Sequence, residues 1–116
     1  MPYLSGRRVD DQVATITFED DDDLSDAISV RGHAITGLII PTIDSANLTF
    51  QVCDTRTGTY STLKDKDGST ITITAGTGGF AVSTDDLTPL AAYRFIKIAT
   101  SAAQTADREF LFILKV

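Results

Sequence analysis

Alternation of apolar and polar residues is the dominant pattern along this chain. Apolar side chains occupy every second position over residues 13–18 and 48–53, and again over residues 69–74. A period of two is typical of a β-strand that packs one face on a core and exposes the other. No segment keeps a helical period for three turns. The sequence predicts one helical turn, at residues 85–90, with an aspartate as its N-cap.

Other segments are strands of a different kind. Residues 34–40 are almost continuously apolar and precede Pro41, which predicts a buried strand that ends at a sheet edge, because proline has no N–H to donate. Residues 108–116 carry apolar side chains on both faces, as in a central strand or a strand covered by another chain. With turn signals every eight to twelve residues, the pattern predicts eight or nine strands in an antiparallel β-sandwich or small barrel.

Composition supports an all-β single domain. The chain has 116 residues, and fourteen of its sixteen acidic residues are aspartate, alongside seventeen threonines. Threonine is β-branched and suits strands, whereas aspartate and glycine are frequent in turns. Turns are predicted at residues 64–68 and at the glycine-rich residues 76–79, which we expect to separate two strands. A length of this order corresponds to one domain.

Charge and cysteine content exclude several classes. A net charge of −6 opposes binding to nucleic acid, which depends on lysine and arginine. No stretch approaches the ~20 apolar residues of a membrane span, and the first residues lack the pattern of a signal peptide. The single cysteine, Cys53, has no partner for an internal disulfide. We therefore expect synthesis in the cytoplasm, with no membrane and no nucleic acid among its partners.

Candidate chemistry is sparse. Glu19 is followed by four aspartates, Asp20 to Asp23, which offer oxygen ligands for calcium. Successive side chains of an extended segment point in opposite directions, however, which favours a solvated acidic loop. His33 and Cys53 each occur once and lack the partners of a catalytic triad or a metal site. The sequence therefore predicts no enzyme, no cofactor and no metal.

The first residues form a separate feature. Residues 1–11 predict an irregular N-terminal arm, and residues 12–116 the β-domain. A frayed terminus is one interpretation. The other is an arm that orders on a partner, with Tyr3 and Leu4 as apolar anchors and Arg7 and Arg8 binding carboxylates.

Four stretches carry a resemblance to a known family. Residues 37–41 (Gly-Leu-Ile-Ile-Pro) lead into the strand at residues 46–52, and residues 93–98 lead through residues 104–108 into the last strand. These stretches, about half of the chain, resemble a family of small β-sandwich proteins from tailed-phage structural gene clusters. Where that family has a serine and an aromatic-rich turn, this chain has Cys53 and no tryptophan.

The resemblance implies a jelly-roll-like capsid cement or decoration protein. Such proteins bind the outer surface of a phage head, at junctions between subunits of the major capsid protein, usually as homotrimers. A carbohydrate-binding or host-adhesion module on a head or tail fibre is the alternative, because its sandwich is similar. Sugar-binding modules stack sugars on exposed aromatic side chains, and the absence of tryptophan here favours the cement protein.

Overall fold

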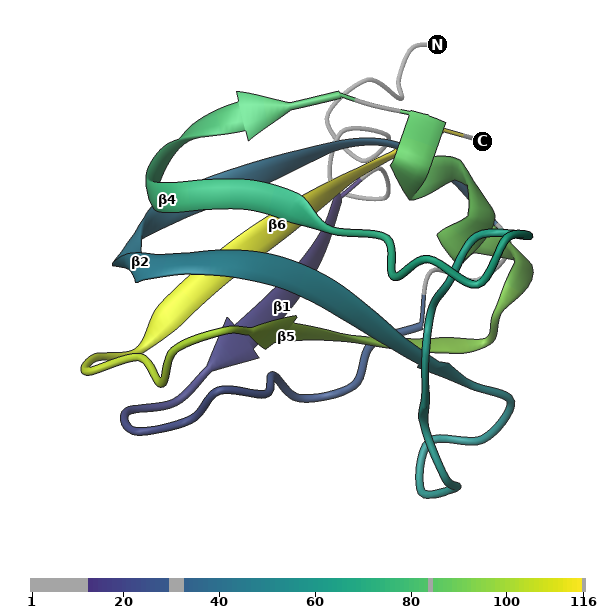
Figure 1. The fold of residues 1–116 in the computed structure, drawn as a ribbon, viewed down its shortest axis with the longest axis horizontal. Helices are drawn as coiled ribbons and strands as arrows, with labels where there is room; N and C mark the ends of the chain where they lie inside the picture. Colours follow the sequence, from purple (N-terminus) through teal and green to yellow (C-terminus); the bar gives the residue numbers. More distant parts are fainter. Residues whose placement is uncertain (1–12, 30–32, 84, 116) are drawn as a thin grey trace, which may run out of the picture.

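The described part of the chain is all-β. The computed structural model describes residues 13–29, 33–83 and 85–115, in which six strands form one antiparallel sheet and one short 3₁₀ helix is present (Figure 1). The elements in chain order are β1 (Val13–Phe18), β2 (Ala34–Cys53), β3 (Ser61–Thr62), β4 (Ile73–Val82), η1 (Asp85–Ala92), β5 (Phe95–Thr100) and β6 (Arg108–Lys115).

Strand β2 is the centre of the sheet. Its first part pairs with β6 as far as Ile39, and its last part, from Leu48 onward, pairs with β5 on a separate ladder. It also pairs with β4 and, near its end, with β3. Strand β1 joins the sheet through β6. Four of the other five described strands therefore depend directly on β2 for their hydrogen bonds.

The curvature of β2 closes the core. Register shifts in its ladder with β4 lie between Thr42 and Asn47, where bulges bend and twist a strand. The bend brings Phe50, beside β5, to a ring-centroid distance of 6.4 Å from Phe112 of β6. Phe18 of β1 packs on Phe110 of the adjacent strand β6, at a ring-centroid distance of 5.4 Å. Both parts of the sheet thus contribute aromatic side chains to one core.

Helix η1 covers part of that core. Leu87 and Leu90 of η1 are fully buried, and two aspartates occupy its first turn. The helical turn predicted at residues 85–90 is confirmed. The predicted turn at residues 64–68 is confirmed too, because Gly68 has a φ of 85° and the N–H of Asp65 donates to the carbonyl oxygen of Ser69.

The prediction that a strand ends at Pro41 is wrong. Strand β2 runs through Pro41, which lies between the partner pairs Ile40–Phe80 and Thr42–Gly78. The ladder with β6 has already ended at Ile39. A proline without a backbone N–H is therefore accommodated where β2 passes from one partner strand to the next.

The glycine-rich residues 76–79 do not separate two strands as predicted. They lie inside β4, and Gly76, Gly78 and Gly79 have φ values of 54°, 72° and 80°. Glycine adopts these left-handed conformations without strain, so β4 follows the bend of β2 instead of breaking.

The described residues hold six strands, compared with eight or nine expected. The segments 34–40 and 48–53, expected as two strands, belong to the single strand β2. Residues 73–74, at the end of the expected strand 69–74, continue through to residue 82 in the single strand β4. Outside these strands, Ile28 forms an isolated bridge with Ile96 of β5. Among the described residues, no helix is long and apolar enough to span a membrane.

Alanine substitutions at Gly76 and Gly78 separate two effects of an added Cβ, namely backbone strain and steric clash. Both glycines have positive φ, but a Cβ at Gly78 would clash with the carbonyl oxygen of Pro41, whereas nothing lies within 4 Å of one at Gly76. We expect Gly76→Ala to lower the free energy of unfolding by about 1–2 kcal/mol, from backbone strain alone. Gly78→Ala should lower it by about 3 kcal/mol or more. Urea denaturation measures both, and equal losses would contradict the close approach of β4 to β2.

Candidate functional site

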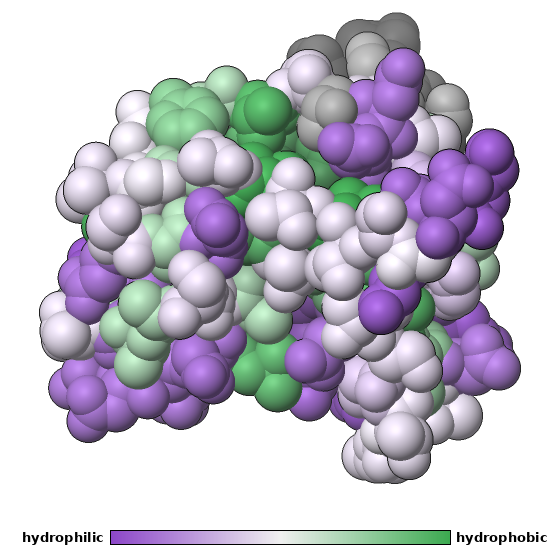
Figure 2. All heavy atoms as spheres, in the orientation of Figure 1, coloured by the Kyte–Doolittle hydropathy of each residue, from purple (hydrophilic) through white to green (hydrophobic). Residues whose placement is uncertain are grey.

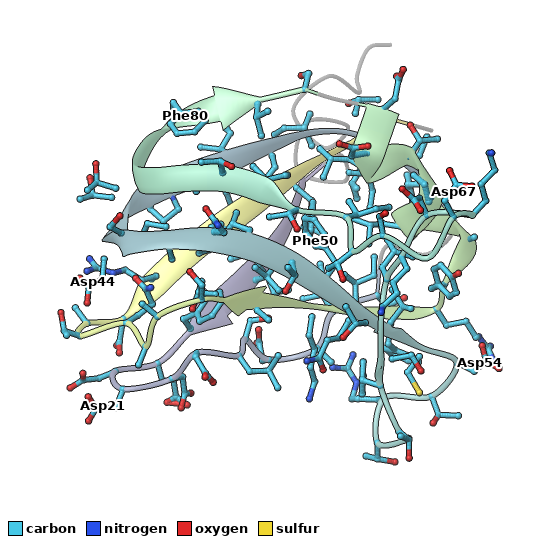
Figure 3. The ribbon with its side chains drawn as sticks, in the orientation of Figure 1. Asp21, Asp44, Phe50, Asp54, Asp67 and Phe80 are labelled. Carbon is cyan, nitrogen blue, oxygen red and sulfur yellow. The ribbon has the colours of Figure 1, made fainter. Side chains whose placement is uncertain are left out.

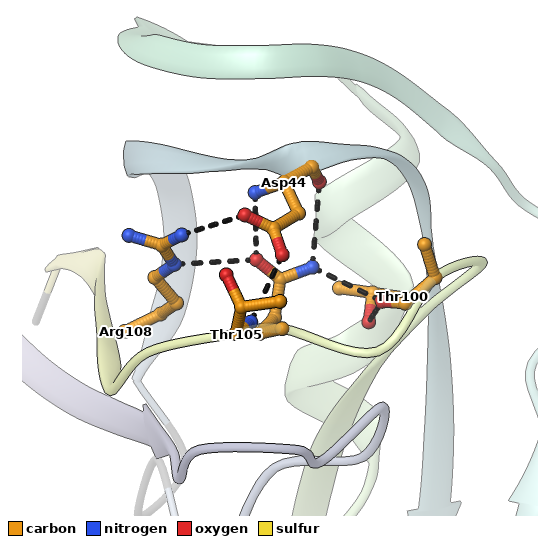
Figure 4. A network of polar contacts seen from close by, with 6 residues as sticks. Asp44, Thr100, Thr105 and Arg108 are labelled. Carbon is orange, nitrogen blue, oxygen red and sulfur yellow. Dashed lines mark hydrogen bonds and ion pairs between the residues drawn. The ribbon is translucent and has the colours of Figure 1, made fainter.

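A buried glutamine organises the turn between β5 and β6. The side chain of Gln104 is completely buried. Its Oε1 accepts hydrogen bonds from the N–H of Asp44 (2.9 Å) and from Nε of Arg108 (3.3 Å). Its Nε2 donates to the carbonyl oxygens of Ala102 (3.0 Å) and Asp44 (3.4 Å) (Figure 4). Because every polar atom of the amide is paired, Gln104 fastens this turn to the bend of β2.

Asp44 completes the same network. Its carboxylate accepts a hydrogen bond from the N–H of Thr105 (2.9 Å) and forms an ion pair with Arg108 (2.9 Å) (Figure 4). Hydrogen bonding from Thr105 holds the pKa of Asp44 below its ordinary value, with a further contribution from the charge of Arg108 and against the effect of desolvation. These contacts stabilise the ionised carboxylate, so the network has a structural role. We call the network of Asp44, Gln104, Thr105 and Arg108 the clamp.

The acidic run, which we define as Glu19 to Asp23, is anchored to this clamp by its backbone. The N–H of Asp21 donates to the carbonyl oxygen of Gln104, and the N–H of Asp20 donates to the carboxylate of Asp107. Asp21 has a φ of 72°, so the run turns sharply instead of remaining extended. The side chains of Glu19 and all four aspartates that follow it are exposed. No three histidine, cysteine or acidic residues in the described ranges are grouped to hold a metal ion.

An apolar row crosses the outer face of the sheet. Along β6, Phe110 and Phe112 are buried, whereas Leu111 and Ile113 are half-buried on the opposite face. Ile39 of β2 lies opposite Leu111 and is 40% exposed, a high value for a large apolar side chain. Ala81 of β4 is the next partner of Ile39 across the sheet, and it is exposed. We call Ile39, Ala81, Leu111 and Ile113 the apolar row.

The segment after β2 folds back over β5 through contacts between cations and aromatic rings. The guanidinium of Arg56 lies 4.9 Å from the ring centroid of Phe95, and its Nη1 donates to the carbonyl oxygen of Ala27. The ammonium group of Lys97 lies 4.4 Å from the ring centroid of Tyr60. Desolvation raises the pKa of the Tyr60 hydroxyl, and electrostatic interaction with Cys53 raises it further. We call the surface formed by Arg56, Tyr60, Phe95 and Lys97 the cation–aromatic surface.

Cys53 borders the cation–aromatic surface, because it lies opposite Phe95 in the ladder of β2 with β5. Cys53 is the last residue of β2, half-buried, with its sulfur 3.9 Å from the hydroxyl of Thr55. It lines an open cleft of about 370 Å³ together with Lys64 and Tyr93. His33 is half-buried and immediately precedes β2. His33 and Cys53 therefore lie at opposite ends of β2.

The residues predicted to bind a partner lie outside the described part of the chain. These are Tyr3, Leu4, Arg7 and Arg8, together with the whole predicted arm. The two-faced apolar pattern of residues 108–116 indicates Leu111 and Ile113, but sequence reasoning missed Ile39, because it belongs to a run that reads as wholly buried. It also missed the pairing of Asp44 with Arg108, since no local signal joins residues 64 positions apart.

Comparisons with known proteins leave the family open. Family models, curated proteins and solved structures contain no match to this chain. The apolar row, the acidic run and the cation–aromatic surface are the described surface features that bear on function.

The lowered pKa of Asp44 makes stability depend on pH. A carboxyl group whose pKa is lower in the folded than in the unfolded protein stabilises the fold at neutral pH, and this contribution disappears as the pH falls through the folded pKa. We expect Asp44→Asn to be less stable than the wild type at pH 7, with the difference shrinking below about pH 4. Thermal unfolding across this range measures it. As a control, Asp67→Asn should change little, because the pair of Asp67 with Lys66 is highly exposed. A difference for Asp44→Asn that stays constant with pH would contradict the assignment.

Proposed function

We propose that this chain is a structural, non-enzymatic virion protein that cements or decorates the outside of a phage head. In this proposal its curved sheet is a jelly-roll-like sandwich, and homotrimers bind the major capsid protein at junctions between subunits. The observation that carries the proposal is the apolar row on the outer face of β2, β4 and β6. Apolar patches on an outer surface mark sites of protein association.

The apolar row suits a contact of modest strength. Burying one large apolar side chain contributes about 1.5–3 kcal/mol, and the row offers three such side chains, in Ile39, Leu111 and Ile113. Two of the three are already half-buried, so each copy gains only part of this free energy. A head that binds many copies multiplies the effect, because each bridge between subunits raises the free energy needed to separate them.

The acidic side chains are compatible with dense decoration. Figure 2 shows hydrophilic side chains gathered at the lower left, over the segment that follows β1. Like charges on neighbouring decorated particles repel one another and keep the particles dispersed.

The carbohydrate-binding alternative needs an aromatic platform for sugars. The rings of Phe95 and Tyr60 each already contact a cation, and both side chains are half-buried. The side chain of Phe80, near the end of β4, is 42% exposed (Figure 3). The ring of Phe80 contacts no other aromatic ring of the described residues, and a single exposed ring is a weak sugar platform, which supports the cement protein over the alternative. A glycan array with and without calcium tests it, and a specific signal that Phe80→Ala abolishes would favour carbohydrate binding.

Substitution of Ile39 tests the apolar row. We expect Ile39→Asp to weaken binding to undecorated, empty phage heads by at least about tenfold, because a carboxylate would have to be desolvated at the contact. Co-sedimentation of the protein with the heads measures binding, and circular dichroism checks the fold.

Thr74→Asp is the matched control for this test. It introduces the same charge at an exposed position of β4 outside the row, and it should bind as the wild type does. Ala81→Asp provides a second variant within the row at another exposed position. A wild type that does not bind heads would overturn the function, whereas full binding by both row variants would overturn the role of the row.

Removal of the predicted arm tests its part in binding. Deleting residues 1–8 removes Tyr3, Leu4, Arg7 and Arg8, and we expect it to abolish binding to empty heads. All strands of the described sheet begin after this segment, so the domain should stay folded. Binding of the truncated, folded domain with undiminished affinity would show that the arm is not a contact.

A further inference from the structure

Acidic side chains gather at one end of the described structure. The segment after β1 and the turn between β5 and β6 are joined there by hydrogen bonds, and Glu109 lies opposite Thr17 at the same end. Within this group the described cation is Arg108, which is paired with Asp44. In Figure 3, Asp21 and Asp44 lie at the left of the molecule. The acidic residues at this end are Glu19, Asp20, Asp21, Asp22, Asp23, Asp26, Asp44, Asp107 and Glu109.

The cation–aromatic surface lies toward the opposite end of β5. Arg56 stacks on Phe95, the first residue of β5, whereas the acidic run contacts its last residue through a hydrogen bond from the N–H of Thr100 to the carbonyl oxygen of Asp23. Figure 3 places Asp54, two residues before Arg56, at the right of the molecule and Asp21 at the left.

Arg56 and Lys97 are held in place without an acidic partner. Among the described residues, the ion pairs are Lys66 with Asp67 and Arg108 with Asp44. Their contacts with Phe95 and Tyr60 restrict the two long side chains, so less conformational entropy remains to be lost when an anion binds. Two positioned cations without an ion pair to a described carboxylate stand out in a chain of net charge −6, although Asp54 lies two residues before Arg56.

We propose that the acidic run of one copy, Glu19 to Asp23, docks on Arg56 and Lys97 of a second copy. The two surfaces are complementary in charge and lie toward opposite ends of β5, so they meet between copies. The contact is reciprocal in a twofold dimer, in which each copy contributes both surfaces, or heterologous in a closed ring or an open filament. The contact requires no capsid, so this proposal goes beyond the proposed function and does not depend on it.

Electrostatics sets the expected strength of the contact. Each exposed ion pair contributes little, and charges on a surface are screened within about 8–10 Å at physiological ionic strength. Five acidic side chains facing two positioned cations act together, so association should be weak, favoured by low salt and lost at high salt.

Charge reversal on each surface provides the test. Variant one is Arg56→Glu with Lys97→Glu, and variant two replaces Asp20, Asp22 and Asp23 by lysine, with Asp21 retained because of its positive φ. In sedimentation velocity of the purified chain at low salt, we expect the wild type to associate. Each variant alone should associate at least about tenfold more weakly, because its two surfaces now carry the same sign. An equimolar mixture should associate again, since the run of variant one meets the unaltered surface of variant two.

The control reproduces the change in net charge of variant one at a different place. Lys64→Glu with Lys66→Glu changes the charge as variant one does, but at two exposed side chains outside the cation–aromatic surface, and it should associate as the wild type does. If a charge-reversed variant unfolds by circular dichroism, Arg56→Gln with Lys97→Gln replaces it, with the same expected weakening. A wild type that stays monomeric at low salt, variants that associate as it does, or a mixture of folded variants that stays monomeric would each overturn the contact. Binding of the chain to heads is a separate measurement, so either proposal can fail alone.

Discussion

The fold depends on one long strand that supplies hydrogen bonds to two groups of partners. Strand β2 pairs with β6 along its first part and with β5 along its last part, while β4 follows it through the bend. A straight strand would hold these partners in one open layer. The bend instead brings Phe50 onto Phe112, so that buried side chains from both parts of the sheet fill a single core. Everything else in the structure is arranged around that bend.

The bend has its own support at the surface. Asp44 lies within it, and the buried amide of Gln104 connects its backbone to the turn before β6. The acidic run is fastened to the same turn by backbone hydrogen bonds. Many like charges can therefore be held close together, because their backbone is paired and their side chains remain in solvent. One arrangement thus stabilises the bend and gathers acidic charge at one end.

Local pattern predicted much of this fold and little of its surfaces. Alternation located β1 and the end of β2, a run apolar on both faces located β6, and turn residues located the turn at Gly68, because these features depend on neighbours in sequence. Pro41 and the glycines of β4 led to wrong predictions of where strands end, since proline and glycine each disfavour a strand when considered in isolation. Their effect depends on the partner strand, which only the tertiary structure supplies. The pairing of Gln104 with Asp44 joins residues sixty positions apart and has no local signal.

The sequence by itself determined the all-β class, the supply of residue types that favour strands and turns, and the acidic character of the chain. Those properties belong to single residues and to their nearest neighbours. The tertiary structure decided that β2 is continuous, that Ile39 is exposed within an apolar run, and that acidic and cationic side chains gather toward opposite ends of β5. The reason is that exposure and charge separation are properties of strand register and curvature, which form only when distant segments pair.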